Sequence, residues 1–399
     1  MPGRWSILAL LFMVRTAMAI QYQSVAAVAP LLASTYGVGI ADVGLLISLY
    51  LAPGIVLALP GGSIGAKLGD KRAVLAGLAL MTAGGAITVL SDSWSGQIAG
   101  RLIAGIGGVL LNVLMSKMIV DWFSGREMAT AMAVFVNSWP VGIAIGLVAL
   151  PLIVVHASVE TAFFACTALV FFGLVAMVLL YRDPPAAANS ASMPASAWPD
   201  RNPAYAVIAA GATWAFFNAG LAMLFAFGPS MLAERGWSIE AAGSATSLAL
   251  WLTAVSVPLG GYVTDYIKRP GAVIVVSCLT FAVLMLAATR VDQVIAIFVL
   301  MGIVGGLPAG AIMSLPARVL EPGTRAIGMG IYFTVFYIGM VLGPLVGGMF
   351  GSLFGSSAAT FDLGAVWLAG TCLSVWLYRR LACAMVADEV PAPSKTGAR

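Results

Sequence analysis

Residues 5–32 read WSILALLFMVRTAMAIQYQSVAAVAPLL, an apolar stretch whose only charged residue is Arg15. At a rise of about 1.5 Å per residue, a helix of this length can cross the roughly 30 Å hydrocarbon core of a bilayer. Arg15 would then lie about 15 Å along the helix, near the middle of the bilayer. An unpaired cation at this depth costs about 2.5–3.5 kcal/mol on insertion scales, so the stretch predicts a membrane helix with a polar cavity or an anion beside it.

Comparable stretches recur along the whole chain, which is 61% hydrophobic and 9% charged. This composition and spacing predict an all-α membrane protein with twelve transmembrane helices. The predicted spans are 5–32, 41–62, 73–91, 96–120, 128–154, 161–181, 204–230, 239–262, 271–289, 294–318, 326–350 and 361–378. The first span is too long for the core of a signal peptide, so we expect it to remain in the mature protein.

The positions of the basic residues predict the orientation of these spans. All but four of the 20 lysines and arginines fall on one side of the predicted topology. Arg15 and Arg101 fall within spans, and Arg235 and Arg290 fall on the other side. By the positive-inside rule, both termini are cytoplasmic, as in a multi-pass protein of a bacterial inner membrane. The net charge of +4 then reflects topology and gives no reason to expect a nucleic-acid partner.

An internal duplication organises the spans. Shifting the chain by 199 residues aligns Pro30 with Pro229 and Gly44 with Gly243, and a shift of 198 aligns Ser116 with Ser314. We therefore predict two six-helix repeats in parallel orientation, over 1–181 and 204–378. Residues 182–203 between them begin RDPPAAANSASMPASAWPDR, which predicts a cytoplasmic linker, and 379–399 are expected to form a cytoplasmic tail.

Several short motifs accompany this organisation. Gly261-Tyr-Val-Thr-Asp265 is followed by Lys268 and Arg269. Residues 62–72 form a degraded copy of this motif, with Ala66 at the position that corresponds to Asp265. The fourth span contains Arg101-Leu-Ile-Ala-Gly105-Ile-Gly-Gly108, with Asn112 on the same helical face. The eleventh contains a glycine/proline motif over residues 339–348.

Twelve spans, two parallel repeats and these motifs together resemble the major facilitator superfamily. The resemblance covers essentially the whole chain and implies a secondary transporter that works by alternating access. It also implies gating residues in the two loop motifs, namely Gly62, Lys67, Asp265, Lys268 and Arg269, with Asp265 as a latch between the halves. The stretch from Asn218 to GPSMLAERGW and the arginine in the first span resemble, loosely, cyanate and nitroimidazole-type transporters. Nitrate and oxalate carriers are disfavoured, because the spans that carry their basic residues are uncharged here.

The cavity of that family is lined mainly by its first, fourth, seventh and tenth helices, which selects candidate residues in this chain. Tyr22 follows Arg15 by seven residues on the same face, and Asn218 follows Trp214 by four. By the duplication Trp214 is the counterpart of Arg15, so the two side chains are expected to face each other. The predicted solute-binding residues are Arg15, Tyr22, Arg101, Asn112, Asn137, Trp214, Asn218 and Tyr332. For each of them packing between helices is an alternative, and for Arg15 this would be a bond to a backbone carbonyl or a glutamine.

All sixteen acidic residues fall in loops or at span ends. A cationic substrate would require a buried carboxylate as counter-ion, so we predict a small polar, carboxylate-like anion as the solute. This inference fails if Asp42 or Glu240, at span ends, line the cavity. No cofactor or metal site is expected, nor an enzyme, because the sequence offers no catalytic triad, metal cluster or phosphate loop. A multidrug or metabolite efflux antiporter and a transport-inactive membrane sensor remain alternatives, and we expect a monomer whose other partner is membrane lipid.

Overall fold

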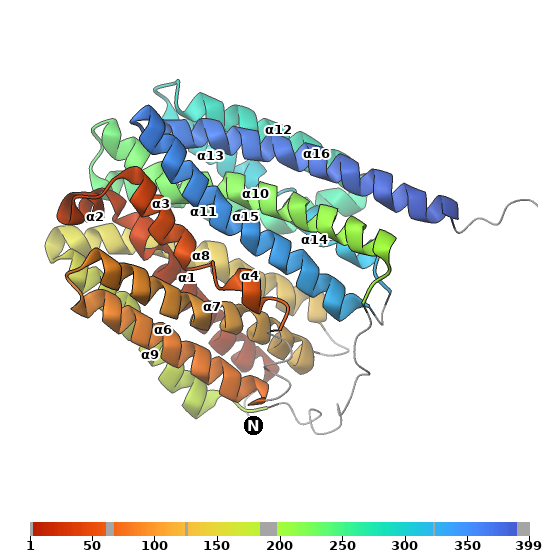
Figure 1. Cartoon of the computed structure of the whole chain (residues 1–399), viewed down its shortest axis with the longest axis horizontal. Coiled ribbons are helices and arrows are strands. Elements are labelled where there is room, and N and C mark those ends of the chain that lie inside the picture. Colours follow the sequence, from red (N-terminus) through yellow and green to blue (C-terminus); the bar gives the residue numbers. More distant parts are fainter. Residues whose placement is uncertain (1–2, 61–67, 124–126, 184–197, 322–323, 389–399) are drawn as a thin grey trace, which may run out of the picture.

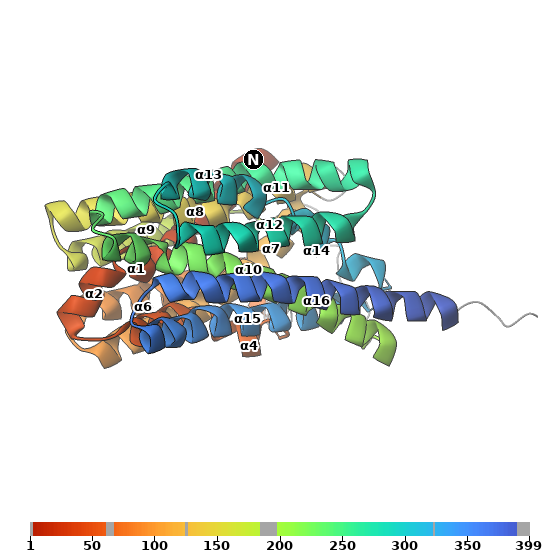
Figure 2. The same cartoon turned by 90° about the horizontal axis from the view of Figure 1, so that it is seen from above.

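The computed structural model describes residues 3–60, 68–123, 127–183, 198–321 and 324–388. Within these residues, twelve segments are long and apolar enough to cross a membrane. They confirm the twelve predicted spans, with boundaries that differ by a few residues. In Figures 1 and 2 the helices lie roughly parallel to one axis, as expected for a bundle that spans a bilayer.

The first six spans form one group, drawn in red to yellow in Figure 1. Its helices are α1 (Arg4–Ala27), α2 (Ala29–Tyr36), α3 (Ile40–Leu49), α4 (Gly54–Leu57), α6 (Asp70–Leu90), α7 (Trp94–Phe123), α8 (Met128–His156) and α9 (Val159–Leu180). In this N-terminal half α1 packs on α8 and α9, and α6 packs on α7.

The last six spans form the second group, drawn in green to blue in Figure 1. Its helices are α10 (Arg201–Glu234), α11 (Ile239–Ile267), α12 (Pro270–Ala288), α13 (Val294–Gly305), α14 (Ala309–Met313), the 3₁₀ turn η2 (Pro316–Arg318), α15 (Arg325–Phe354) and α16 (Ala358–Asp388). In this C-terminal half α10 packs on α15 and α16, and α11 packs on α13. Residues 184–197 of the predicted linker lie outside the described residues.

Three predicted spans are broken near prolines. The first divides into α1 and α2 at Val28, two residues before Pro30. The second span divides into α3 and α4 at a turn that ends with Pro53, and the tenth divides into α13 and α14 at Pro308. Proline has no backbone N–H and obstructs the carbonyl four residues earlier, so a helix interrupts there. Irregular backbone inside a membrane is tolerated where protein buries it, and here neighbouring helices do so.

The last helix is longer than predicted. We expected the twelfth span to end at 378, but α16 continues to Asp388. The residues that follow 378, RRLACAMVAD, contain no glycine or proline and consist largely of good helix formers. The hydropathy pattern marks where the chain leaves the membrane. The helix continues beyond that point, so the predicted end of the span lies before the end of α16.

The two halves meet mainly along three pairs of spans: α3 and α4 with α15, α8 with α11, and α1 and α2 with α10. The helices of the two halves approach each other most closely at glycine residues. A Cβ at Gly44 of α3 would overlap the Pro344 carbonyl oxygen, and one at Gly243 of α11 would overlap that of Leu147. Both glycines lie in the first turns of spans that begin at the end of the bundle opposite the chain termini, which we call the distal end. The halves are therefore in close contact at the distal end.

Candidate functional site

Arg15 lies inside the bundle and is 9% exposed. Its Nε donates to Asn112 Oδ1 at 3.1 Å, and its Nη1 donates to the carbonyl oxygens of Phe135 and Val136 at 3.0 and 3.2 Å. Nη1 also lies 3.4 Å from Ser138 Oγ, and the guanidinium carbon lies 4.7 Å from the centre of the Phe135 ring. Nη2 has no hydrogen-bond partner among the described residues, so one edge of this cation remains free to bind a ligand.

One of the carbonyl groups that hold Arg15, that of Val136, is available because α8 contains a proline. Pro140 follows Val136 by four residues and has no N–H to donate to the Val136 carbonyl. Arg15, from the neighbouring α1, takes the place of that missing donor. Nη1 thus makes the packing contact that was the alternative to solute binding for Arg15, a bond to a backbone carbonyl. Nη2 remains available to bind a solute.

Asn112 links Arg15 to the other half of the molecule. While its Oδ1 accepts from Arg15, its Nδ2 donates to Tyr337 Oη of α15 at 3.0 Å. The Tyr337 ring lies against the backbone of Gly54, where a Cβ would collide with it. Arg15, Asn112 and Tyr337 therefore form a hydrogen-bonded chain that crosses from the N-terminal to the C-terminal half.

Arg101 occupies a different environment, closer to the distal end. It is 3% exposed, and it donates to the carbonyls of Gln21, Tyr22 and Leu46 at 2.8, 2.7 and 3.4 Å. Its guanidinium carbon lies 4.8 Å from the centre of the Tyr50 ring. These contacts join α7 to α1 and to the broken second span, and a cavity of about 20 Å³ beside them has room for about one water molecule.

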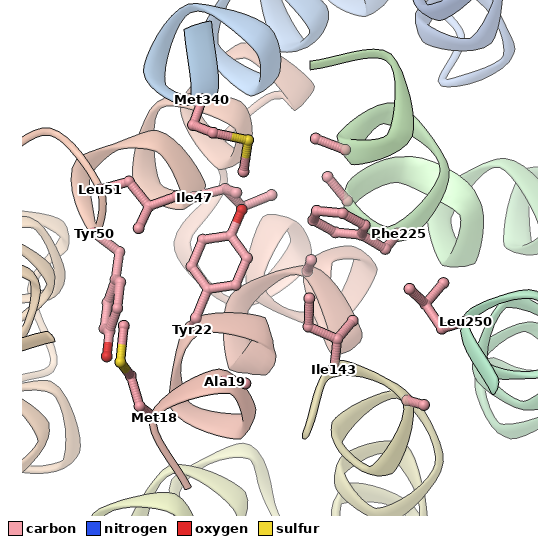
Figure 3. Close-up of a cluster of buried hydrophobic side chains, with 14 of the residues drawn as sticks. Met18, Ala19, Tyr22, Ile47, Tyr50, Leu51, Ile143, Phe225, Leu250 and Met340 are labelled. Atoms are coloured by element: carbon pink, nitrogen blue, oxygen red, sulfur yellow. The ribbon is translucent and has the colours of Figure 1, made fainter. Parts of the chain in front are cut away.

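Tyr22 is also buried, at the contact between the halves. Its ring lies 5.1 Å from Trp139 and 6.2 Å from Phe225 of α10, and its hydroxyl has no partner among the described residues. Figure 3 shows Tyr22 surrounded by apolar side chains from both halves, including Ile47, Phe225, Leu250 and Met340. We call these five residues the distal plug, because they fill the space between the halves on the distal side of Arg15.

The remaining predicted binding residues are distributed over both halves. Asn137 has a buried Oδ1 without a partner among the described residues, and Asn218 Nδ2 donates to the Trp214 carbonyl within α10. Tyr332 is fully buried and its hydroxyl lies 3.5 Å from the Met313 sulfur. The expected pairing of Trp214 with Arg15 is not found: Trp214 stacks on Phe217 and Phe336, and the ring over Arg15 is Phe135.

The predicted gating residues are only partly described. Gly62 and Lys67 lie outside the described residues, as does the side chain of Asp265, whose backbone belongs to α11. Lys268 ends α11 in the left-handed conformation, and Arg269 occupies the N-cap position of α12; both side chains are exposed.

The two acids on which the charge argument depends do not approach Arg15. Asp42 Oδ2 accepts from the Gly39 N–H at 3.0 Å, at the start of α3. Glu240 lies in the first turn of α11, at the distal end of the bundle. Among the described residues, no carboxylate forms an ion pair with Arg15 or Arg101.

The sequence profile described as Major Facilitator Superfamily matches residues 9–231 and 208–397, nearly the full chain. The chain belongs to the major facilitator superfamily. This confirms the predicted family, and with it a multi-pass membrane transporter rather than an enzyme.

Individual relatives match shorter regions. The inner membrane transport protein YajR of Escherichia coli is 29% identical over 146 residues, which are 35% of this chain and 32% of YajR. Azole resistance protein 1 of Saccharomyces cerevisiae is 37% identical over 67 residues, 17% of this chain and 11% of that protein. The alignments thus span about a third or less of these relatives.

Solved structures match over the whole chain. Two crystal structures of a bacterial homolog of the human lysosomal transporter Spinster cover 98% of this chain and 100% and 99% of theirs. The inward-facing and occupied form gives a TM-score of 0.74 at 16% identity, and the inward-facing and unoccupied form gives 0.72 at 14%. At this identity, the likeness establishes the fold.

Sequence reasoning missed Ser138 and the Phe135 ring as neighbours of Arg15, and it favoured Tyr332 over Tyr337 on the eleventh span. Pro140 was the available signal, because a proline inside a span marks a carbonyl four residues earlier that needs another donor. Pro229 gives a second example: Gln23 Nε2 donates to the Phe225 carbonyl at 2.8 Å.

Proposed function

We propose that this protein transports a small carboxylate-bearing anion across the bacterial inner membrane by alternating access, with both termini in the cytoplasm. The observation that carries the proposal is Arg15, a buried cation with a free Nη2 edge and no carboxylate partner among the described residues. A bound carboxylate would supply the missing counter-charge. Charge-assisted hydrogen bonds of this kind are roughly twice as strong as neutral ones.

The proposed site lies on the proximal side of the distal plug, toward the chain termini. Arg15 would bind the carboxylate, and the partly exposed Asn137, Trp214 and Asn218 are predicted to contact the rest of the solute. Because the Asn112–Tyr337 hydrogen bond joins the halves, a solute that competes for Arg15 or Asn112 would alter a contact between them. This competition is a proposed route by which binding affects the conformational equilibrium.

With the orientation that the positive-inside rule predicts, we infer an inward-facing conformation, because the closest backbone contacts between the halves lie at the distal end. The similarity to inward-facing structures supports this conformation. The loose likeness to cyanate and nitroimidazole-type transporters, the monomeric state and the latch at Asp265 stay predictions. For the latch, Asp265→Asn should increase the inward-facing population, and unchanged labelling of a cysteine in the distal plug would contradict it.

Efflux of hydrophobic compounds is the second candidate function. The stack formed by Trp214, Phe217 and Phe336 offers an aromatic surface, and the short match to azole resistance protein 1 favours the same class of activity. Here the compound would bind mainly to the aromatic rings, and Arg15 would serve as a structural link between α1 and α8.

A thermal-stability screen of the purified protein separates the two candidates. Small carboxylates, neutral solutes and lipophilic cations are compared on the wild type, on Arg15→Ala, and on Arg4→Gln as a matched control. Arg4 lies on the same helix, in an exposed pair with Glu127 at 2.8 Å. A ligand at 100 times its Kd stabilises the folded state by about 2.7 kcal/mol.

We expect one class of carboxylates to stabilise the wild type and Arg4→Gln but not Arg15→Ala. Stabilisation by cations or neutral drugs that persists in Arg15→Ala would overturn the anion proposal in favour of efflux. If no solute of any class stabilised the wild type, the transport-inactive sensor would become the better assignment.

A further inference from the structure

A cavity of about 470 Å³ lies at the proximal end of the C-terminal half, away from Arg15. It is formed where α11 ends, α12 begins, and α16 passes beside the turn η2. Its lining includes four cationic residues, Lys268, Arg269, Arg318 and Arg379, whose side chains are all exposed. None of the four forms a hydrogen bond or an ion pair with another described residue through its side chain.

The positive charges around this cavity repel one another when no anion is bound. Arg269 occupies the N-cap position of α12, where the helix dipole is positive, and it makes no side-chain cap bond. Arg379 reaches over the first turn of the same helix: its Nη1 lies 3.5 Å from the position that a Cβ on Gly271 would take. Cations gathered around a helix N-terminus repel one another and the dipole, and a bound anion would relieve both repulsions.

At the corresponding position of the N-terminal half, groups of the protein itself balance the positive charges. In the first turns of α6, Asp70 pairs with Lys117 at 2.6 Å, and Lys71 Nζ donates to the Tyr181 carbonyl at 2.8 Å. Here a carboxylate and the carbonyl end of α9 provide the negative charge. The described residues that line the C-terminal cavity include no carboxylate, so a bound anion would supply counter-charge to the four cations.

The surroundings of the cavity place it at the headgroup level of a membrane. Tyr262 and Tyr266, in the last turns of α11, are 70% and 79% exposed and stack on each other. Trp376, one turn before Arg379 on α16, is 52% exposed. Exposed tyrosine and tryptophan at span ends are typical of the boundary between hydrocarbon and headgroups. Leu377 lies beside Trp376, and Leu373 continues the exposed apolar face of α16 toward the bilayer centre.

We propose that this cavity binds the headgroup of an anionic phospholipid of the cytoplasmic leaflet. The four cations and the α12 N-terminus would hold the phosphate, and the acyl chains would lie along the exposed leucines of α16. The volume argues for a headgroup over a free phosphate ion, because it lies within the range of about 300–1,000 Å³ that is usual for sites of drug-sized molecules. The inference does not depend on which solute the protein transports.

Native mass spectrometry of the full chain in neutral detergent tests the proposal, with phosphatidylglycerol and phosphatidylcholine as the probes. Each cation near a membrane surface contributes about a fivefold gain in affinity for anionic lipid. We expect Arg379→Gln to weaken phosphatidylglycerol binding about fivefold, and the double variant Lys268→Gln/Arg379→Gln about 30-fold. Arg380→Gln is the matched control: it removes the same charge from the next residue of α16, which stacks on Trp376 outside the cavity.

Three results would overturn the proposal. Equal retention of phosphatidylcholine would show that the charges do not select the lipid. An equal loss of phosphatidylglycerol in Arg380→Gln would show a diffuse surface effect. Displacement of phosphatidylglycerol by millimolar inorganic phosphate, with equal thermal protection by that ion, would show a free-anion site.

A second measurement covers the case in which the variants fold poorly. In the wild type, raising the salt from 0.1 M to 1 M shortens the Debye length from about 10 Å to about 3 Å. The preference for phosphatidylglycerol should fall toward that for phosphatidylcholine, and Arg379→Lys, which keeps the charge, should retain most of the binding at low salt. A preference unaffected by salt in the wild type would contradict the proposal.

Discussion

Replacing Gly44 by alanine should open the distal end. A Cβ at Gly44 would overlap the Pro344 carbonyl oxygen and lie 2.9 Å from Gly348 Cα. Ordinary carbon contacts are about 3.5–4.0 Å, so α3 and α15 would have to separate by roughly 1 Å. Overpacking of this kind costs about 1–3 kcal/mol, and the cost is confined to the conformation in which the two helices touch. The population open at the distal end should therefore rise about 5-fold to 150-fold.

Cysteine labelling in proteoliposomes measures this shift. Ile47 is 1% exposed and belongs to the distal plug, so Ile47→Cys should react slowly with a membrane-impermeant maleimide until the halves separate. The native cysteines that are not buried, Cys372 and Cys383, are replaced by serine beforehand. Gly173→Ala of α9 is the matched control, because a Cβ there would make only an ordinary contact, 3.6 Å from Val14 Cγ2 in the same half.

We expect Gly44→Ala to raise the labelling rate at least fivefold and Gly173→Ala to leave it unchanged. An unchanged rate in a Gly44→Ala protein that elutes as a folded species would refute the reasoning, because the glycine contact would then not hold the distal end closed. An equal increase in both variants would refute it as well, since general loosening would explain the result.

Three further predictions concern hydrogen bonds and charges. Arg101→Met removes the donors to three buried carbonyls, so it should lower the free energy of unfolding by about 2–4 kcal/mol, measured by thermal unfolding. If the variant keeps its stability but loses ligand binding, Arg101 is instead a solute contact. Tyr337→Phe removes one hydrogen bond between the halves, worth about 0.6 kcal/mol, so the labelling rate of Ile47→Cys should rise about threefold. A lower labelling rate would contradict the role of this bond in holding the halves together. Arg290→Gln breaks an exposed pair with Asp362, so unfolding should change by less than about 1 kcal/mol, and by less still at high salt.

The fold could be predicted almost entirely from the sequence, because a membrane imposes a strict length and composition on each span. All twelve spans were found from apolar runs alone. The differences lie where other physics acts: α16 continues past the hydrocarbon, and Pro53 and Pro308 break helices that hydropathy reads as continuous.

The candidate site could be predicted less well, because it depends on which helix faces meet. Arg15 and Asn112 were both named from the sequence, and the structure joins them directly. Their contact with Tyr337 depends on the rotation of α15, which apolar periodicity does not fix in a helix buried on several sides. The pairing of Trp214 with Arg15 was inferred from the duplication, but the repeats have diverged in which ring fills the space near the cation.

Among the residues that the structure describes, two hydrogen bonds join the halves at the distal end, and both run from a side chain to a backbone carbonyl. Gln23 Nε2 donates to Phe225 O, and Ser247 Oγ donates to Ala144 O, each at 2.8 Å. An acceptor of this kind is present whatever residue occupies positions 225 and 144. Mutational drift at those positions leaves the bonds intact, so methods that infer contacts from correlated substitutions would not detect these two links. Evolution can thus reshape the surface around them while the two donors alone remain under constraint.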